Sequence, residues 1–184
     1  KGEAEEAKKD LESKKAELDE QRKAADQMVK ELQADQEAAE LLLQEKEKEE
    51  ARIQQEIKKK ERELAEQMAA AQMNWTATAG GYIWPETKSK RITSPMGGRD
   101  TGIKGASTNH KGVDIGGVGY STNVLATKAG IVTISKRSSS YGEYVVIQHG
   151  PGNTTLYAHM SSRAVKDGDV VSQGQRIGVT GSTG

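Results

Sequence analysis

The sequence predicts a long α-helical coiled coil followed by an all-β domain. Nineteen of the 20 glycines and all 3 prolines lie after residue 79, so the first part almost lacks turn-forming residues. Residues 1–73 consist mainly of Ala, Glu, Lys, Leu and Gln, which favour helix. The last part carries short β-branched runs between glycine turns. We therefore expect a coiled-coil helix over 1–79, a linker and lead-in over 80–91, and an antiparallel sandwich or barrel over 92–184.

Charge divides the chain in the same way. Residues 1–73 hold 15 Lys and Arg against 21 Asp and Glu, whereas residues 74–184 hold 12 against 6. The net charges of −6 and +6 indicate two different folding regimes, and the positive part suits an anionic polymer as a partner. The chain has no cysteine, which excludes disulfides and thiol chemistry. No apolar run approaches the roughly 18–20 residues of a membrane span. No secretory signal is visible, and the opening KGEAEEAKKD reads as the middle of a helix, so we expect a piece of a longer protein.

The helix should need a partner. A sevenfold repeat of apolar positions runs through its first half: Ala4, Leu11, Leu18, Ala25, Leu32 and Ala39. A second track three positions on is only half apolar, and the repeat continues in a shifted frame at Ile57 and Leu64. A helix this polar buries too little surface alone, so we expect a coiled-coil partner, either a second copy, an upstream helix or a regulatory protein. The helix is then a regulatory or positioning arm, or else a plain spacer.

The β domain begins with an aromatic lead-in. Tyr82, Trp84 and Pro85 follow the Gly80-Gly81 pair, and we interpret Trp84 as a packing anchor. After residue 92 the chain reads as short strands joined by tight turns. The predicted strand segments are 130–136, 143–150, 154–161 and 175–181, and residues 165–171 hold an Asp-Gly turn.

One short stretch carries candidate metal ligands. In NHKGVDIGG, His110 and Asp114 are four residues apart, and alternate residues of a strand point to one face. Both side chains could then reach one ion, because histidine nitrogen and carboxylate oxygen are ligands that catalytic zinc uses. Such spacing is common by chance, and the alternative is a pair of solvent-exposed polar residues. His159, in LYAHMS, completes the candidate set, whereas His149 in IQHGPGN is interpreted as structural.

Several ordered motifs resemble one family. They are YIWP, ITSPMGGR, HKGVD, VLATKAGIVT, YGEYVVIQHG, TTLYAHMS and VKDGDVVSQGQRIGVTGSTG. In this order they are similar to the lysostaphin-type, LytM-like zinc metallopeptidases, which cut peptide cross-links in peptidoglycan. The resemblance covers residues 82–184, nearly the whole second part of the chain, and implies the LytM-type β fold.

The resemblance implies roles for three residues. His110 and Asp114 would be zinc ligands, and His159 would be a catalytic histidine that orients the attacking water or stabilises the oxyanion. The family takes its third zinc ligand from a His-x-His motif that would follow Gly184. We therefore expect residues 1–184 alone to bind zinc weakly and to be inactive, and the β domain to lack its closing strand.

The expected function follows from the resemblance. It is a zinc-dependent endopeptidase that acts on peptidoglycan peptide, outside the cell in the wall or periplasm, with no nucleic-acid partner. One alternative is a non-enzymatic activator of other cell-wall hydrolases, which some relatives with lost metal ligands become. Another is a structural coiled coil with a wall-binding domain. The presence of His110, Asp114 and His159 favours the enzyme.

Overall fold

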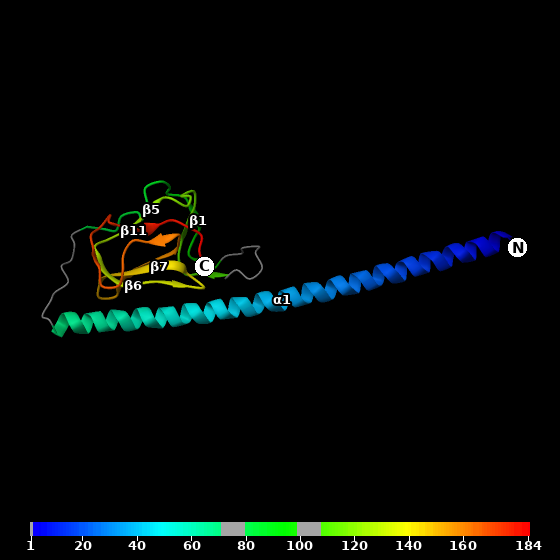
Figure 1. The fold of residues 1–184 in the computed structure, drawn as a ribbon, viewed down its shortest axis with the longest axis horizontal. Coiled ribbons are helices and arrows are strands. Elements are labelled where there is room, and N and C mark those ends of the chain that lie inside the picture. The colour runs from blue at the N-terminus through cyan, green and yellow to red at the C-terminus, as the bar shows by residue number, and fades with distance from the viewer. Residues whose placement is uncertain (1, 71–79, 99–107) are drawn as a thin grey trace. The chain divides into compact units, whose positions relative to one another are not determined.

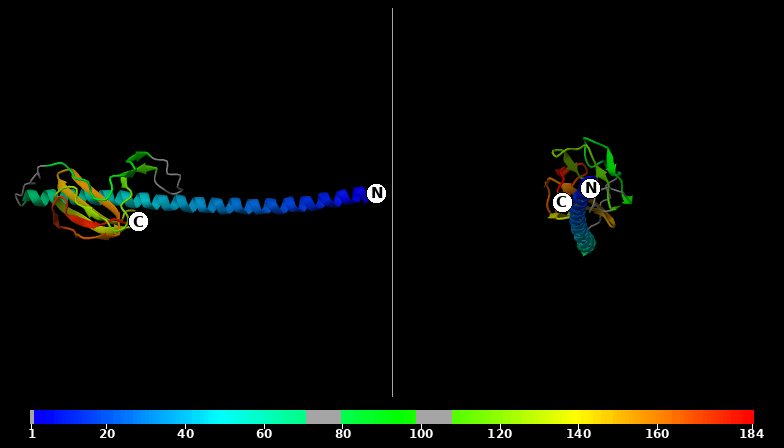
Figure 2. Two further views of the ribbon diagram at one scale, coloured as in Figure 1. Left: turned by 90° about the horizontal axis from the view of Figure 1, so that it is seen from above. Right: turned by 90° about the vertical axis from the view of Figure 1, so that its right-hand side faces the viewer.

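A long helix opens the chain and short strands make up the rest, in a computed structural model that describes residues 2–70, 80–98 and 108–184 (Figures 1 and 2). The helix, α1 (Gly2–Ala70), is uninterrupted, as its lack of proline and internal glycine predicts. The predicted fold class is confirmed, since every strand that follows pairs antiparallel. The predicted helix end at residue 79 lies outside the described residues. Within the described part, no helix is both long enough and apolar enough to cross a membrane.

The strands of the described part are short at the start and long in the middle. In chain order they are β1 (Ile92–Ser94), β2 (Gly97–Gly98), β3 (Asn109–His110), β4 (Asp114–Ile115), β5 (Asn123–Leu125), β6 (Gly130–Ser138), β7 (Gly142–Gly150), β8 (Asn153–Met160), β9 (Ser162–Arg163), β10 (Val170–Val171) and β11 (Arg176–Val179). The main sheet has the order β10-β6-β7-β8 and a smaller one has the order β5-β11-β9, while β1 pairs with β4 and β2 with β3. The four runs predicted as strands correspond to β6, β7, β8 and β11, and the predicted Asp-Gly turn lies at residues 167–168.

Strand β7 is the centre of the fold because it is buried on both faces. Its residues 144–147, Tyr-Val-Val-Ile, are completely buried. On one face, Val145 and Ile147 pack in a core with residues of the smaller sheet, including Ile177. On the other face, Tyr144 and Val146 pack in a second apolar cluster. Strands buried on two faces read as continuous apolar runs, which is what YVVI shows.

The second cluster is completed by the C-terminal part of α1. Ile53 and Ile57 are 4% and 7% exposed and pack against Ile134, Tyr144 and Val146. Burying each isoleucine is worth about 1.5–3 kcal/mol. Residues 44–70 therefore belong to the same compact unit as the β domain, whereas residues 1–43 fall in a separate unit.

The earlier part of α1 carries exposed apolar side chains. Leu18, Met28, Leu32 and Leu42 are all more than half exposed, and all four lie on the two heptad tracks. Apolar positions at this spacing are the surface that a partner helix covers in a coiled coil. The coiled-coil partner stays a prediction.

His149 has the structural role that its sequence context predicts. Its Nδ1–H donates to the carbonyl of Ala129 (2.9 Å), which leaves Nε2 to accept from the hydroxyl of Thr155 (2.7 Å). The Tyr82 ring of the lead-in meets the imidazole edge to face, with centroids 5.6 Å apart. His149 is 8% exposed, so it serves as a buried link between the lead-in and the main sheet.

Acidification should weaken the fold through this histidine. Burial lowers the pKa of His149, and the nearby Lys128 charge lowers it further, against the opposing effect of the hydrogen bond to Ala129. The unfolded chain therefore binds this proton more readily than the folded one, and stability is lost as pH falls below about 6.5 towards the folded-state pKa. We expect the Tm of the wild type to drop over this range and that of His149→Gln to drop less. Equal pH dependence of the two proteins in thermal unfolding would refute the assignment.

Candidate functional site

His110 and Asp114 lie at the two sides of a break in a β-ribbon. Strand β3 ends at His110 and pairs with β2, and β4 begins at Asp114 and pairs with β1. The chain between them bends, so the two residues do not occupy alternate positions of one strand, and that part of the sequence prediction was wrong. The two side chains nevertheless meet, with His110 Nε2 3.3 Å from Asp114 Oδ1. A nitrogen and a carboxylate oxygen thus point to the same place.

The other nitrogen of His110 is held by the backbone. Nδ1 lies 3.0 Å from the carbonyl oxygen of Pro95 and 3.3 Å from the hydroxyl of Ser94. A carbonyl can only accept, so Nδ1 carries the proton and donates it to Pro95. Nε2 then presents a lone pair towards Asp114. Metal-binding histidines are typically oriented by such a hydrogen bond from the second ring nitrogen to a carbonyl.

The pair therefore fits two positions of a zinc site by donor type and orientation. Zinc with a catalytic role takes three protein ligands. No cluster of three or more His, Cys, Asp or Glu residues suited to hold a metal occurs among residues 2–70, 80–98 and 108–184. Within the described ranges, His110 and Asp114 therefore offer two donors to a metal ion, and their role as zinc ligands stays a prediction.

The lead-in supports the strand that carries Asp114. Glu86 is 6% exposed, and its carboxylate accepts hydrogen bonds from the indole N–H of Trp84 (3.1 Å) and the backbone N–H of Ser89 (2.8 Å). The Ser89 hydroxyl in turn donates to the carbonyl of Gly116 (2.7 Å), two residues after Asp114. The indole N–H of Trp84 also donates to the carbonyl of Ser89 (2.8 Å), and the interpretation of Trp84 as a packing anchor stays a prediction. The sequence analysis did not single out Glu86, although an isolated acidic residue directly after Trp84-Pro85 was a signal for it.

His159 adopts a backbone conformation that few non-glycine residues take. Its φ is +57°, and no other non-glycine residue among those described has a positive φ. The register of β7 and β8 shifts here, because Glu143 faces Met160 while Val145 faces Tyr157. Two residues of β8 thus oppose one of β7, which is a β-bulge, and bulges re-aim side chains at sites. The bulge leaves His159 exposed, between the half-buried Ala158 and the buried Met160.

Strain of this kind is kept where the surroundings fix it, and it concentrates at functional sites. The N–H of His159 donates to the carbonyl of Tyr141 (2.8 Å), and its Nδ1 lies 2.7 Å from the carbonyl oxygen of Thr183. The same tautomer rule as for His110 places the proton on Nδ1 and leaves Nε2 to face outwards. The expectation that His159 orients the attacking water or stabilises the oxyanion stays a prediction.

Helix α1 contacts the segments next to both candidate histidines. Lys111, beside His110, forms an ion pair with Glu50 (3.0 Å), which raises the pKa of Lys111 through the side-chain hydrogen bond. Tyr141, whose carbonyl holds His159, lies 3.5 Å through its hydroxyl from the amide nitrogen of Gln54. Residues 50–54 of α1 therefore contact a neighbour of each candidate histidine, Lys111 beside His110 and Tyr141 beside His159.

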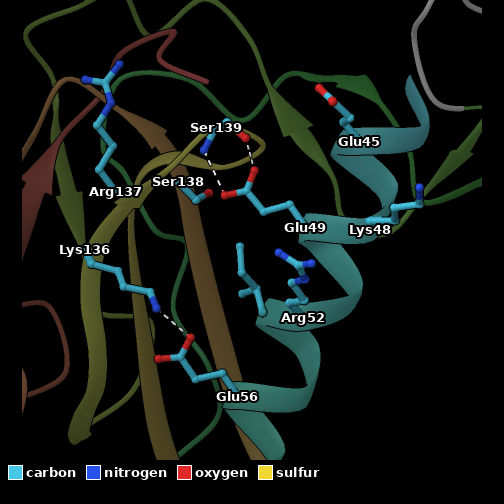
Figure 3. Close-up of a pocket in the computed structure, with 10 residues that line it drawn as sticks. Glu45, Lys48, Glu49, Arg52, Glu56, Lys136, Arg137, Ser138 and Ser139 are labelled. Carbon is cyan, nitrogen blue, oxygen red and sulfur yellow. Dashed lines mark hydrogen bonds and ion pairs between the residues drawn. The ribbon is translucent and has the colours of Figure 1, made fainter. Parts of the chain in front are cut away.

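A cavity of about 630 Å³ lies elsewhere, between α1 and the end of β6 (Figure 3). Its walls carry charged groups of both signs, and several of these are already paired. Lys136 Nζ lies 2.5 Å from Glu56, and Glu49 accepts hydrogen bonds from Ser139 (Figure 3). None of the three candidate site residues lines it. The cavity is a gap between the helix and the sheet, separate from the site.

Comparison with known proteins identifies the β domain. Residues 108–184 match peptidase family M23. The chain is 43% identical over 75 residues to the peptidoglycan DD-endopeptidase ShyA of Vibrio cholerae, covering 41% of this chain and 17% of that protein. It is 37% identical over 105 residues to the DD-carboxypeptidase/endopeptidase Mpg of Neisseria meningitidis, covering 57% and 24%. An uncharacterized metalloprotease of Haemophilus influenzae is 34% identical over 115 residues, covering 61% and 24%.

A solved structure agrees with these relatives. The crystal structure of a zinc-containing peptidase from Vibrio cholerae matches with a TM-score of 0.52 at 30% identity, covering 57% of this chain and 33% of that one. The β domain of this chain is a LytM-like domain of the M23 peptidases, as the sequence motifs indicated. The chain spans about a quarter or less of the length of the curated relatives.

Proposed function

We propose that this protein is a zinc-dependent endopeptidase that hydrolyses peptide cross-links of bacterial peptidoglycan. The observation that carries the proposal is the His110–Asp114 pair, with Nε2 and Oδ1 3.3 Å apart and Nδ1 held by the Pro95 carbonyl. The M23 match and the peptidoglycan endopeptidases among its relatives support the reaction and the substrate class. A substrate of this kind lies outside the cytoplasm, so we place the protein in the cell wall or periplasm.

Each residue of the candidate site would have a separate role. His110 Nε2 and the Asp114 carboxylate would hold zinc, and the family resemblance places the third ligand in a His-x-His motif after residue 184. When bound, zinc lowers the pKa of a water molecule and polarises the scissile carbonyl. Pro95 fixes the His110 tautomer, and the lead-in holds the end of the Asp114 strand through Ser89 and Gly116.

His159 would act on the substrate side of the ion. Its Nδ1–H is engaged by the Thr183 carbonyl, so Nε2 is the atom available to the reacting groups. A neutral Nε2 accepts a proton from the attacking water, and a protonated one donates to the oxyanion that forms as the carbonyl becomes tetrahedral. The exposed side chain of His159 suits either role, because the substrate must reach it.

Purified peptidoglycan tests the proposal. We expect the full-length protein to release new amino termini from it, to lose this activity with a chelator, and to regain it with zinc. Mass spectrometry of the fragments would identify the bond that is cut. A full-length protein that binds zinc and releases no amino groups, while it stimulates another purified wall hydrolase, would instead support the non-enzymatic activator.

We also propose that α1 is a regulatory arm of the peptidase. Residues 44–70 pack on the β domain through Ile53 and Ile57, and Glu50 and Gln54 contact the segments beside His110 and His159. A long substrate that enters the site would meet this turn of the helix. Withdrawal of the helix would therefore open the site, and a coiled-coil partner that binds the heptad positions could bring this about.

Replacing Ile57 with glutamate should release the arm. A buried charge without a partner is costly, so the helix should leave the apolar cluster. We expect peptidoglycan hydrolysis by full-length Ile57→Glu to rise several-fold above the wild type. The matched control is Leu41→Glu, because Leu41 lies on the same helix, is 62% exposed and is off both heptad tracks. Unchanged or lower activity of folded Ile57→Glu would show that the helix does not restrict the site.

A further inference from the structure

Thr183 lies against the bulge that carries His159, and its hydroxyl, its N–H and its carbonyl all form hydrogen bonds there. Its Oγ1 accepts from the backbone N–H of Glu143 on β7 (2.9 Å) and donates to the carbonyl of Met160 on β8 (2.6 Å). Its own N–H points to the carbonyl of His159 (3.4 Å). One hydroxyl thus connects the two strands at the position where their register shifts.

The same residue holds the imidazole of His159. The carbonyl oxygen of Thr183 lies 2.7 Å from Nδ1, and this carbonyl can only accept. The hydroxyl of Thr183 therefore anchors the residue, and its carbonyl selects the Nδ1–H tautomer of His159. In functional histidines, a carbonyl or carboxylate that accepts from one ring nitrogen sets the tautomer in the same way.

The chain around Thr183 leaves no space for a different arrangement. Gly142 has a φ of +60°, and a Cβ there would overlap the carbonyl and the hydroxyl of Thr183. A Cβ at Gly181 would overlap the backbone at Met160 and Ser161. Glycine at these two positions lets residues 181–184 lie directly against the bulge. The close approach is what brings the Thr183 carbonyl within hydrogen-bond distance of the ring.

We propose that Thr183 is a positioning residue for His159 in the peptidase reaction: its hydroxyl bridges β7 and β8, and its carbonyl fixes the ring with Nε2 towards the substrate. This inference rests on the proposed function for its effect on catalysis, whereas the tautomer itself can be observed without any activity. The family resemblance implies roles for His110, Asp114 and His159 and none for Thr183.

The first test is the nitrogen spectrum of ¹⁵N-histidine-labelled wild-type protein. At a pH where the imidazole is neutral, the ¹⁵N chemical shifts should show His159 with its proton on Nδ1. A proton on Nε2 would overturn the proposal outright, and this measurement does not depend on how any variant folds.

The second test is Thr183→Val, which keeps the shape of the side chain and removes the hydroxyl. We expect His159 to become a mixture of tautomers, and kcat on peptidoglycan to fall about 10- to 100-fold with little change in KM. Thr183→Ser, which keeps the hydroxyl, should restore both. Thr180→Val is the matched control, because Thr180 also bridges two backbone groups, the N–H of Thr122 and the carbonyl of Gly119.

The outcomes separate the two proposals. An inactive wild-type protein would reject the peptidase function, and the tautomer would still decide the role of Thr183. An active wild type with a folded Thr183→Val variant of equal kcat and unchanged His159 shifts would reject the positioning role alone. A Thr180→Val variant that lost as much activity as Thr183→Val would also reject it.

Discussion

Replacing His110 with alanine in the full-length protein is expected to abolish peptidoglycan hydrolysis. The change removes the nitrogen that faces Asp114 at 3.3 Å and with it one of the two proposed zinc ligands. Lewis-acid stabilisation of a transition state is worth several kcal/mol, so we expect at least about a 10³-fold loss of rate. The zinc content of the purified protein should fall in parallel, and atomic absorption on the same sample measures it.

Histidine 149 provides the control for this variant. It is the histidine of the sequence that lies outside the candidate site, and its two ring nitrogens bond to Ala129 and Thr155 within the fold. His149→Gln should be less stable and still bind zinc and hydrolyse peptidoglycan at a temperature where it is folded. A His110→Ala protein that kept both zinc and activity would mean that the ion, if any, binds elsewhere.

Replacing His159 should have a different signature. We expect His159→Ala to lower kcat by about 10²–10⁴-fold, the usual contribution of a general acid–base group, while the zinc content stays that of the wild type. The reason is that His159 lies on a bulge of β8, on a different part of the fold from the β3–β4 ribbon. The measurement is kcat on peptidoglycan beside metal analysis of the same preparation.

The comparison of the two variants is informative in itself. Loss of zinc on replacing His159 would make it a ligand, and loss of neither zinc nor rate would remove it from the site. Tm values for both variants are needed, and His159→Gly adds a third measurement because glycine adopts a positive φ without steric cost. A more stable, inactive His159→Gly protein would be the expected sign of strain kept for function.

The fold was predictable because local signals agree along the chain. Residues 3–70 lack glycine and proline and consist mainly of the helix-favouring Ala, Glu, Lys, Leu and Gln, which predicts α1. Alternating or continuous β-branched runs predict β6, β7 and β8. The docking of residues 44–70 on the sheet could not be predicted. Ile53 and Ile57 look like coiled-coil positions, and only the three-dimensional structure shows that β7 needs cover on its second face.

The sequence names candidate residues for the site, but it does not predict how they are arranged in space. The pairing of His110 with Asp114 was expected from spacing on one strand, but a bend between two short strands produces it. The bulge at His159 depends on a register shift between two strands, which no local pattern encodes. The carbonyls of Pro95 and Thr183 orient the two imidazoles, and backbone atoms leave no trace in side-chain motifs.

The central claim is that His110 and Asp114 hold one zinc ion in a peptidase site. Anomalous diffraction at the zinc edge from crystals of the full-length protein tests this claim most directly. The account predicts a single strong peak about 2.0–2.2 Å from both His110 Nε2 and an Asp114 carboxylate oxygen. A peak bound by other residues, or zinc-soaked crystals in which these two side chains contact only water, would contradict it.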